Sequence, residues 1–396
     1  MTVKRGPGLW LFLLLLAGVG GWAWASRSGR LEQWQARLFP EAMRAPRLST
    51  GDFPAGVAAP IGEIASVPLR PTLIGFTPRG SSAALLLATG GASSPDEPSL
   101  SAETRRTGLF RSSYALDAGA VIYARESDLR EALKNGAEHG GVDIALVSVD
   151  RLARWAPELR DHKLRAVLLA GRSRGQEALA AVGVEDLASL RGKRLAAYED
   201  SSAWYFALWT LARAGLGPKD VQWVWLRSNL DAGRALREGR ADAAVGLAGD
   251  VELAARDRGG KVLATTADAP HLIATVLVVR GEFAARYPDA VRRVIRGMLD
   301  AAQAVQRDPL PGARLLGEIA PYLGDPRDAL KLAPPATLRE NLAFFGLAGE
   351  APVTYDELFS SAGALFVKTG RLEQTTPPDE ARDLGALKYV SEARGP

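Results

Sequence analysis

The stretch that decides the fold is Arg194–Trp225, RLAAYEDSSAWYFALWTLARAGLGPKDVQWVW. Its apolar start at Arg194–Ala197 predicts a strand, the apolar periodicity from Ser202 through Leu211 predicts a helix, and Val221–Trp225 predicts a second strand. A strand, a helix and a strand in this order are typical of a parallel pair joined by a crossover helix. This stretch therefore predicts an α/β fold.

The same alternation extends in both directions from this stretch. Further strands are predicted at Leu73–Phe76, Ala120–Tyr123, Asp143–Val147, Leu164–Ala170, Glu177–Val182, Ala243–Val245, Val262–Thr265 and Ile273–Val279. Helices are predicted at Ser82–Thr89, Asp128–His139, Tyr287–Arg307, Pro311–Tyr322, Thr337–Phe345 and Thr354–Lys368. We therefore expect largely parallel sheets, followed by a C-terminal part that is helical throughout.

The composition excludes several kinds of chemistry. The 396 residues contain no cysteine and three histidines, which excludes a disulfide framework, a thiolate zinc site, a cysteine nucleophile and a bacterial lipid anchor. We expect no metal and no cofactor. The formal charge of +4 is not clustered, so we expect no nucleic-acid partner.

The N-terminus carries an export signal. Lys4 and Arg5 precede the apolar run Leu9–Ala25, which ends in an A-x-A-like cleavage site. Residues 1–26 are therefore either a cleaved signal peptide or a transmembrane anchor, and residues 27–70 form a proline-rich linker. The body is expected in the periplasm, secreted, or tethered to the inner membrane by the N-terminal helix.

Residues Gly171–Gly175 form a G-x-S-x-G motif, which in α/β-hydrolases surrounds a nucleophilic serine. Asp200 and His271 follow in the order that such a catalytic triad requires. The motif also requires a helix directly after the serine, whereas Gln176–Val182 reads as a strand. We therefore interpret the motif as a connection between domains and predict that the protein is not an enzyme.

A candidate ligand site follows the strand at Arg194–Ala197. Ser201 and Ser202 lie where the unpaired N–H groups of the next helix emerge, which suits an anion or plain N-capping. Trp204 follows as either a ligand wall or a core residue. Polar segments also follow other strands at Thr77–Ser81, Ser148–Asp150 and Gly246–Asp250, and open α/β sheets bind ligands at such strand ends.

Five motifs in this order resemble a known family. They are LIGFTP (73–78), GLFRSSY with AGAVIYARESDLREALKNG and GVDIALVSVDRLA (108–153), VEDLASLRGK through VQWVWL (184–226), AGRALREGRADAAVGLAGDVELA (232–254) and FAARYPDAVRRVIRGMLDAAQAV (283–305). Together they resemble the periplasmic substrate-binding proteins of the nitrate, sulfonate and taurine type, which include binders of thiamine precursors. The resemblance runs from about residue 71 to residue 370.

The resemblance implies a two-lobed periplasmic binding protein (type II) fold with extra C-terminal helices. Lobe 1 would comprise 71–172 plus 275–396 and lobe 2 would comprise 173–274, joined near Gly171–Gly175 and Thr266–Ala274. The chain would bind a small sulfonate, amine or heterocycle for an ABC permease and its ATPase. The ligand contacts carried over are Thr77, Arg79, Ser148, Asp150, Ser201, Ser202, Trp204 and Asp250.

Glu199 and Asp200, which we also predict as ligand contacts, depart from the family pattern, because small residues commonly precede the serine pair there. Two unpaired carboxylates would oppose an anion by a few kcal/mol, on the order expected for like charges in a cleft. Either Arg79, Arg172 or Arg174 neutralises them, or the ligand is cationic, zwitterionic or neutral. The alternative function is a membrane-anchored sensor or interaction protein with the same fold.

Overall fold

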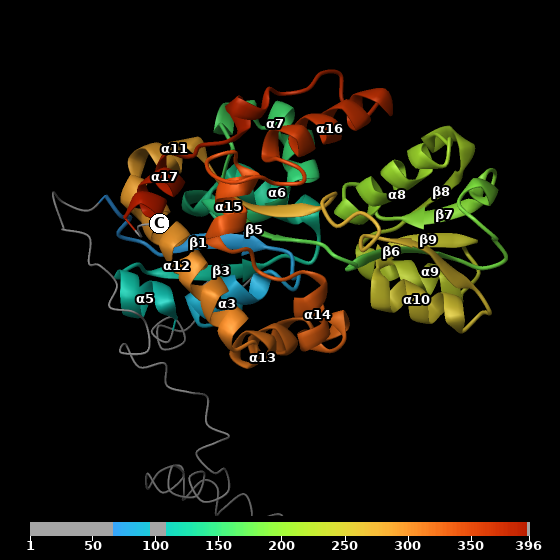
Figure 1. The fold of residues 1–396 in the computed structure, drawn as a ribbon, viewed down its shortest axis with the longest axis horizontal. Helices are drawn as coiled ribbons and strands as arrows, with labels where there is room; N and C mark the ends of the chain where they lie inside the picture. The colour runs from blue at the N-terminus through green and yellow to red at the C-terminus, as the bar shows by residue number, and fades with distance from the viewer. Residues whose placement is uncertain (1–65, 96–107, 394–396) are drawn as a thin grey trace, which may run out of the picture. The chain divides into compact units, whose positions relative to one another are not determined.

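The computed structural model describes residues 66–95 and 108–393 (Figure 1). The predicted signal or anchor at 1–26 lies outside these residues, as does the linker apart from 66–70. Within the described part, no helix is both long and apolar enough to cross a bilayer.

The first sheet has six strands in the order β2-β3-β1-β4-β11-β5. These strands are β1 (Thr72–Phe76), β2 (Ala92–Ser93), β3 (Ala118–Ile122), β4 (Ile144–Ser148), β5 (Arg165–Arg172) and β11 (Ala274–Val279). All residues of β4 and β11 are buried, which agrees with their nearly unbroken apolar sequences.

The second sheet has five strands in the order β10-β6-β9-β7-β8. They are β6 (Glu177–Ala181), β7 (Arg194–Ala197), β8 (Gln222–Trp225), β9 (Ala243–Leu247) and β10 (Lys261–Thr265). In Figure 1, helix α8 (Ser202–Arg213) covers one face of this sheet, and α9 (Ala232–Arg237) and α10 (Ala248–Arg256) cover the other.

Each sheet is parallel except for one reversed strand, which refines the prediction of largely parallel sheets. Strand β11 runs antiparallel to β4 and β5, and β6 runs antiparallel to β9 and β10. Both strands are entered directly from the other sheet, whereas parallel neighbours need a crossover connection such as α8 between β7 and β8. The division into lobes at 172/173 and 274/275 stays a prediction, which this sheet membership supports.

The helices of the first part are α3 (Ser82–Thr89), α5 (Leu109–Tyr114), α6 (Glu126–Asn135) and α7 (Val149–Glu158). After β11 come α11 (Gly281–Arg286), α12 (Pro288–Arg307), α13 (Leu310–Ile319), α14 (Pro326–Leu332), α15 (Leu338–Phe344), α16 (Tyr355–Lys368) and α17 (Gly385–Glu392). Helices α12 and α13 pack against α3, and α16 packs along α7. The predicted helical C-terminal part is therefore present.

The predicted helix Asp128–His139 has different bounds in the structure, and one observed helix was not predicted. The predicted helix Asp128–His139 begins earlier and ends at Asn135, because Gly136 has a positive φ of 75° and a separate 3₁₀ turn follows it. Helix α7 was not predicted at all. It begins directly after β4, and Pro157 lies within it, which is a pattern that argues against a helix.

Candidate ligand-binding site

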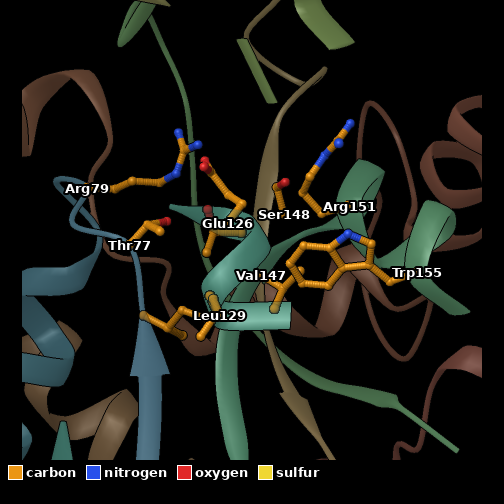
Figure 2. Close-up of a pocket in the computed structure, with 10 residues that line it drawn as sticks. Thr77, Arg79, Glu126, Leu129, Val147, Ser148, Arg151 and Trp155 are labelled. Atoms are coloured by element: carbon orange, nitrogen blue, oxygen red, sulfur yellow. The ribbon is translucent and has the colours of Figure 1, made fainter. Parts of the chain in front are cut away.

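A small cavity lies where strands of the first sheet end. Thr77 and Arg79 follow β1, Ser148 ends β4, and Glu126 begins α6 shortly after β3. Helix α7 adds Arg151 and Trp155, and Figure 2 shows these side chains gathered around the cavity. The cavity holds about 10 Å³, which is room for about one water molecule.

Arg79 connects this cavity to the second sheet. Its guanidinium donates to the Glu177 carboxylate, at the start of β6, and to the Ser202 hydroxyl, at the start of α8. The side chain of Glu177 is almost fully buried, so the ion pair is protected from solvent. The charge of Arg79 is therefore compensated within the protein.

Arg151 forms a second buried charge cluster, and only 1% of this residue is exposed. Its Nε donates to Asp150 Oδ2 at 2.8 Å, and its Nη1 donates to Asp200 Oδ1 at 2.7 Å. Arg154 Nη1 lies 3.2 Å from the same Asp200 oxygen. Burial raises the pKa of Asp200, but these two guanidiniums outweigh it and hold that pKa below its usual range.

The partners predicted for the two unusual acids were wrong. Asp200 is neutralised by Arg151 and Arg154, and Glu199 Oε1 pairs with Arg371 Nη1 at 2.6 Å. The predicted partners are engaged elsewhere: Arg79 by Glu177, Arg172 by the Phe344 ring and the Val353 carbonyl, and Arg174 by Glu340. Helix α7 and the segment after α16, which supply the actual partners, are far away in the sequence.

The serine pair divides into two roles. Ser201 is the N-cap of α8, because its hydroxyl accepts from the Trp204 N–H at 3.1 Å and donates to the Tyr198 carbonyl at 2.7 Å. Ser202 instead accepts from Arg79. Only Ser202 is thus bonded to a residue that lines the cavity.

Trp204 and Asp250 lie outside the residues that line the cavity. Trp204 is 1% exposed and stacks on Phe366 of α16, with ring centroids 5.8 Å apart. Asp250 accepts from the Gly233 N–H at 2.8 Å and pairs with Arg237 at 3.1 Å, which joins α10 to α9. The contacts of both residues are those of packing and helix joining.

Glu126 is the site residue that sequence reasoning missed most clearly. It is 6% exposed, and its recorded side-chain contact is a bond at 3.5 Å from Asn229 Nδ2. Burial raises the pKa of Glu126 to about 7, against the opposing effect of Arg79. In the sequence it is an ordinary acidic residue just before the predicted helix Asp128–His139, so nothing there signals its burial.

Arg151, Trp155 and Glu177 were also missed. The first two lie on the helix that was not predicted, and Glu177 starts a strand that was predicted as purely structural. A charged residue at the first position of an otherwise apolar strand was the one available signal.

The serine of the G-x-S-x-G motif does not occupy a nucleophile elbow. Ser173 is 3% exposed, and strand β6 begins four residues later where a helix would be required. Its hydroxyl bonds to Glu177 and to Thr266 Oγ1, the latter at 2.7 Å. In the described part of the chain, its recorded partners include neither Asp200 nor His271.

Ser173 and Thr266 instead tie together the two segments that connect the sheets. The chain leaves the first sheet after β5 and returns to it before β11, and these segments carry Ser173 and Thr266 respectively. Among residues 66–95 and 108–393, no group of acidic or histidine side chains is arranged to hold a metal ion.

Comparison with known proteins identifies the fold. Residues 140–310 match the family model described as NMT1/THI5 like. Among curated proteins, none matches this chain. The alkanesulfonate-binding protein of Xanthomonas axonopodis pv. citri, solved with MOPS bound, is 19% identical over 78% of this chain and 96% of its own, with a TM-score of 0.57.

Two further solved structures have the same fold. The periplasmic nitrate-binding protein of Synechocystis is 13% identical over 83% of this chain and 90% of its own, with a TM-score of 0.59. A desulfurization enzyme is 12% identical over 81% of this chain and 98% of its own, with a TM-score of 0.53. The fold thus serves binding proteins and also an enzyme. Residues 140–310 are therefore similar to the NMT1/THI5-like family, the chain has the fold of the periplasmic binding proteins, and the resemblance seen in its sequence is confirmed.

Proposed function

We propose that this protein is the solute-binding component of an ABC-type importer and that it encloses a small organic molecule between two lobes. The lobes are residues 71–172 plus 275–396 and residues 173–274. The likeness to sulfonate- and nitrate-binding proteins supports this function, and the dispersed +4 charge does not favour nucleic acid.

The observation that carries the proposal is a polar network around one cavity, with members from both sheets. Arg79 donates hydrogen bonds to Glu177 and Ser202, and Arg151 donates to Asp200. Asn229 donates to Glu126. A structural core would place apolar side chains at such a junction, because buried charges cost free energy even when they are paired. Polar groups that converge on a cavity are instead typical of a ligand site.

The ligand contacts that we propose are Thr77, Arg79, Glu126, Ser148, Arg151 and Ser202. The remaining predicted contacts would act indirectly: Asp150 and Asp200 hold Arg151, Glu199 holds Arg371, Ser201 caps α8, and Trp204 and Asp250 pack. Since the cavity holds about 10 Å³, an organic ligand enters only when the bonds of Arg79 to the second sheet open. The connections at Ser173 and Thr266 are where such a hinge motion would occur.

The test measures binding and lobe closure together. The purified protein is titrated calorimetrically with sulfonates, carboxylates, pyrimidines and amines, and each mixture is measured by small-angle X-ray scattering. We expect at least one compound to bind more tightly than millimolar and to change the radius of gyration. Failure of every compound in both measurements would contradict the proposal.

Arg79→Gln and Arg174→Gln form a matched pair for this test. Both remove a guanidinium, but Arg79 lines the cavity while Arg174 pairs with Glu340 in a half-exposed position. We expect the first variant to change the affinity at least tenfold. The loss of a hydrogen bond to a charged group changes the binding free energy by about 1.5–3 kcal/mol, and about 1.4 kcal/mol corresponds to tenfold. The second should bind as the wild type does.

The permease and ATPase partners, and a periplasmic or tethered location, belong to this proposal. The alternative of an anchored sensor or interaction protein depends on the N-terminal segment, which lies outside the described residues. Mass spectrometry of the mature N-terminus separates the two roles: a start at Ser26 favours the soluble receptor, and an intact Met1 favours the tethered protein.

A further inference from the structure

The guanidinium groups around the cavity already have carboxylate partners. Arg79 is paired with Glu177, and Arg151 is paired with both Asp150 and Asp200. An anionic ligand would therefore compete with carboxylates that are held in place on the same chain. A site built for a sulfonate or nitrate would instead leave at least one buried guanidinium without a counter-ion.

The Glu126 carboxylate, unlike these guanidiniums, lacks a partner of opposite charge among the described residues. It is buried at the same cavity, and within the described residues no ion pair is recorded for it; its contact is the neutral Asn229 amide at 3.5 Å. The cluster contains three guanidiniums, from Arg79, Arg151 and Arg154, and four carboxylates, from Asp150, Glu177, Asp200 and Glu126. Glu126 is the carboxylate that is not paired with any of the three guanidiniums. A second negative charge would add repulsion, whereas one positive charge would balance the cluster.

Two hydroxyl groups line the same cavity as this carboxylate. Figure 2 shows Thr77 and Ser148 on either side of Glu126, and all three line the cavity. Neither hydroxyl has a recorded hydrogen-bond partner in the part of the chain that the structure describes. One carboxylate and two hydroxyl oxygens match the three N–H donors of a primary ammonium group.

Arg151, which lines the same cavity, has one hydrogen-bond donor without a partner among the described residues. Arg151 Nη2 is buried and has no bond among the described residues, although its other nitrogens are used. It can donate to a neutral oxygen on the ligand without disturbing the charge balance.

We propose that this cavity, when opened, binds a small amine of net positive charge, whose ammonium group is held by Glu126, Thr77 and Ser148. A hydroxyl or carbonyl oxygen of the same molecule accepts from Arg151. This inference rests on the proposed function and narrows its ligand class away from the sulfonate and nitrate that the structurally similar proteins bind.

The experiment compares three two-carbon compounds that differ in charge. Ethanolamine carries an amine and a hydroxyl, taurine carries an amine and a sulfonate, and isethionate carries a hydroxyl and a sulfonate. Their net charges are about +1, 0 and −1 at neutral pH. In calorimetric titrations of the purified protein, ethanolamine should bind most tightly, taurine less tightly and isethionate least tightly. The affinities for ethanolamine and isethionate should differ at least about tenfold.

Glu126→Gln tests the acceptor directly, because it keeps the shape of the side chain and removes its charge. We expect it to weaken ethanolamine binding at least about tenfold. Glu185→Gln is the matched control, since Glu185 is exposed and pairs at 3.5 Å with Lys261. Thermal unfolding of both variants shows whether the fold is intact.

The pH dependence provides a second readout that does not depend on a variant. Glu126 faces Arg79, Arg151 and Asp200, and the phenols of Tyr198 and Tyr322, so its titration is the change expected near pH 7 among these groups. Ethanolamine should bind about tenfold more tightly at pH 8 than at pH 6, because the carboxylate becomes ionised over this range. A bound anion would show the reverse.

Each outcome decides the inference. Stronger binding of isethionate than of ethanolamine, or unchanged ethanolamine binding in Glu126→Gln, would overturn it and leave the solute-binding function standing. Binding of none of the three compounds would also overturn it, because a site for a small amine should accept ethanolamine. The proposed function itself falls only when the wide compound panel and the scattering measurement fail as well.

Discussion

The sharpest prediction about stability concerns the buried cluster around Arg151. The Arg151 side chain is 2% exposed and the Asp150 side chain is 0% exposed, so neither charge is solvated by bulk water. Arg151→Met keeps most of the apolar length of the side chain and removes the charge. It leaves Asp150 without a counter-ion, and Asp200 retains Arg154 at 3.2 Å.

The magnitude follows from the asymmetry of buried ion pairs. Removing one partner of such a pair costs about 3–5 kcal/mol, because the remaining charge stays buried and uncompensated. Replacing both partners is far less costly, since no isolated charge is left. We therefore expect Arg151→Met to lower the free energy of unfolding by about 3–5 kcal/mol, and adding Asp150→Asn to restore a substantial part of it.

The assay is urea unfolding followed by tryptophan fluorescence and by circular dichroism, with coincident transitions required before a free energy is extracted. Arg174→Met serves as the control, because its guanidinium is half-exposed and pairs with a half-exposed Glu340. That control should change stability by less than about 1 kcal/mol. The reasoning is refuted when Arg151→Met is no more destabilising than the control, or when Asp150→Asn makes the double variant worse.

Three further predictions concern packing, capping and pH. Trp204→Ala should lower the free energy of unfolding by about 3–5 kcal/mol in the same urea assay, because it empties a buried site beside Phe366, whereas Trp225→Ala, at a side chain 44% exposed, should cost clearly less. Equal losses would contradict the burial of Trp204. Ser201→Ala removes the N-cap of α8 and should cost about 1 kcal/mol, while Ser201→Asp, which also caps, should recover most of it. A loss in Ser201→Ala that the aspartate leaves unchanged would show that the cap is not the cause. The folded-state pKa of Glu126, about 7, lies above its ordinary value of 4.5, so the folded state binds more protons between these values and stability should fall as the pH rises from 5 to 8. The upper limit of that loss is about 3 kcal/mol, and Glu126→Gln should flatten the profile; an identical slope in this variant would refute the assignment.

Local sequence patterns predicted the secondary structure well wherever a strand or helix consists mainly of apolar, buried residues. The strand Arg194–Ala197 and the helix Ser82–Thr89 were predicted at their observed bounds, because unbroken apolar runs and a helical apolar stretch leave few alternatives. The interpretation of Gly171–Gly175 as a connection also followed from the sequence, since an apolar strand directly after the serine excludes the required helix.

The candidate site could be predicted only in part. Strand-end reasoning located Thr77, Arg79 and Ser148, because ligands of α/β sheets bind at the carboxyl ends of strands and those positions can be read from the sequence. The same reasoning also selected Asp250, which joins α10 to α9 and does not line the cavity. A strand end identifies a place in the sheet, but it does not say what the side chain contacts there.

What the sequence by itself determined is the α/β order of elements and the resemblance to the periplasmic binding proteins, and it predicted strand ends as the place of a ligand site. Only the tertiary structure decided which charges compensate one another: Arg79 with Glu177, Arg151 with Asp200, and Glu126 with no cation recorded among the described residues. The physical reason is that secondary structure follows from contacts and propensities close along the chain, whereas a buried charge is stabilised or destabilised by whatever group the fold brings to it. Arg79 and Glu177 are 98 residues apart, so no local pattern records their pairing.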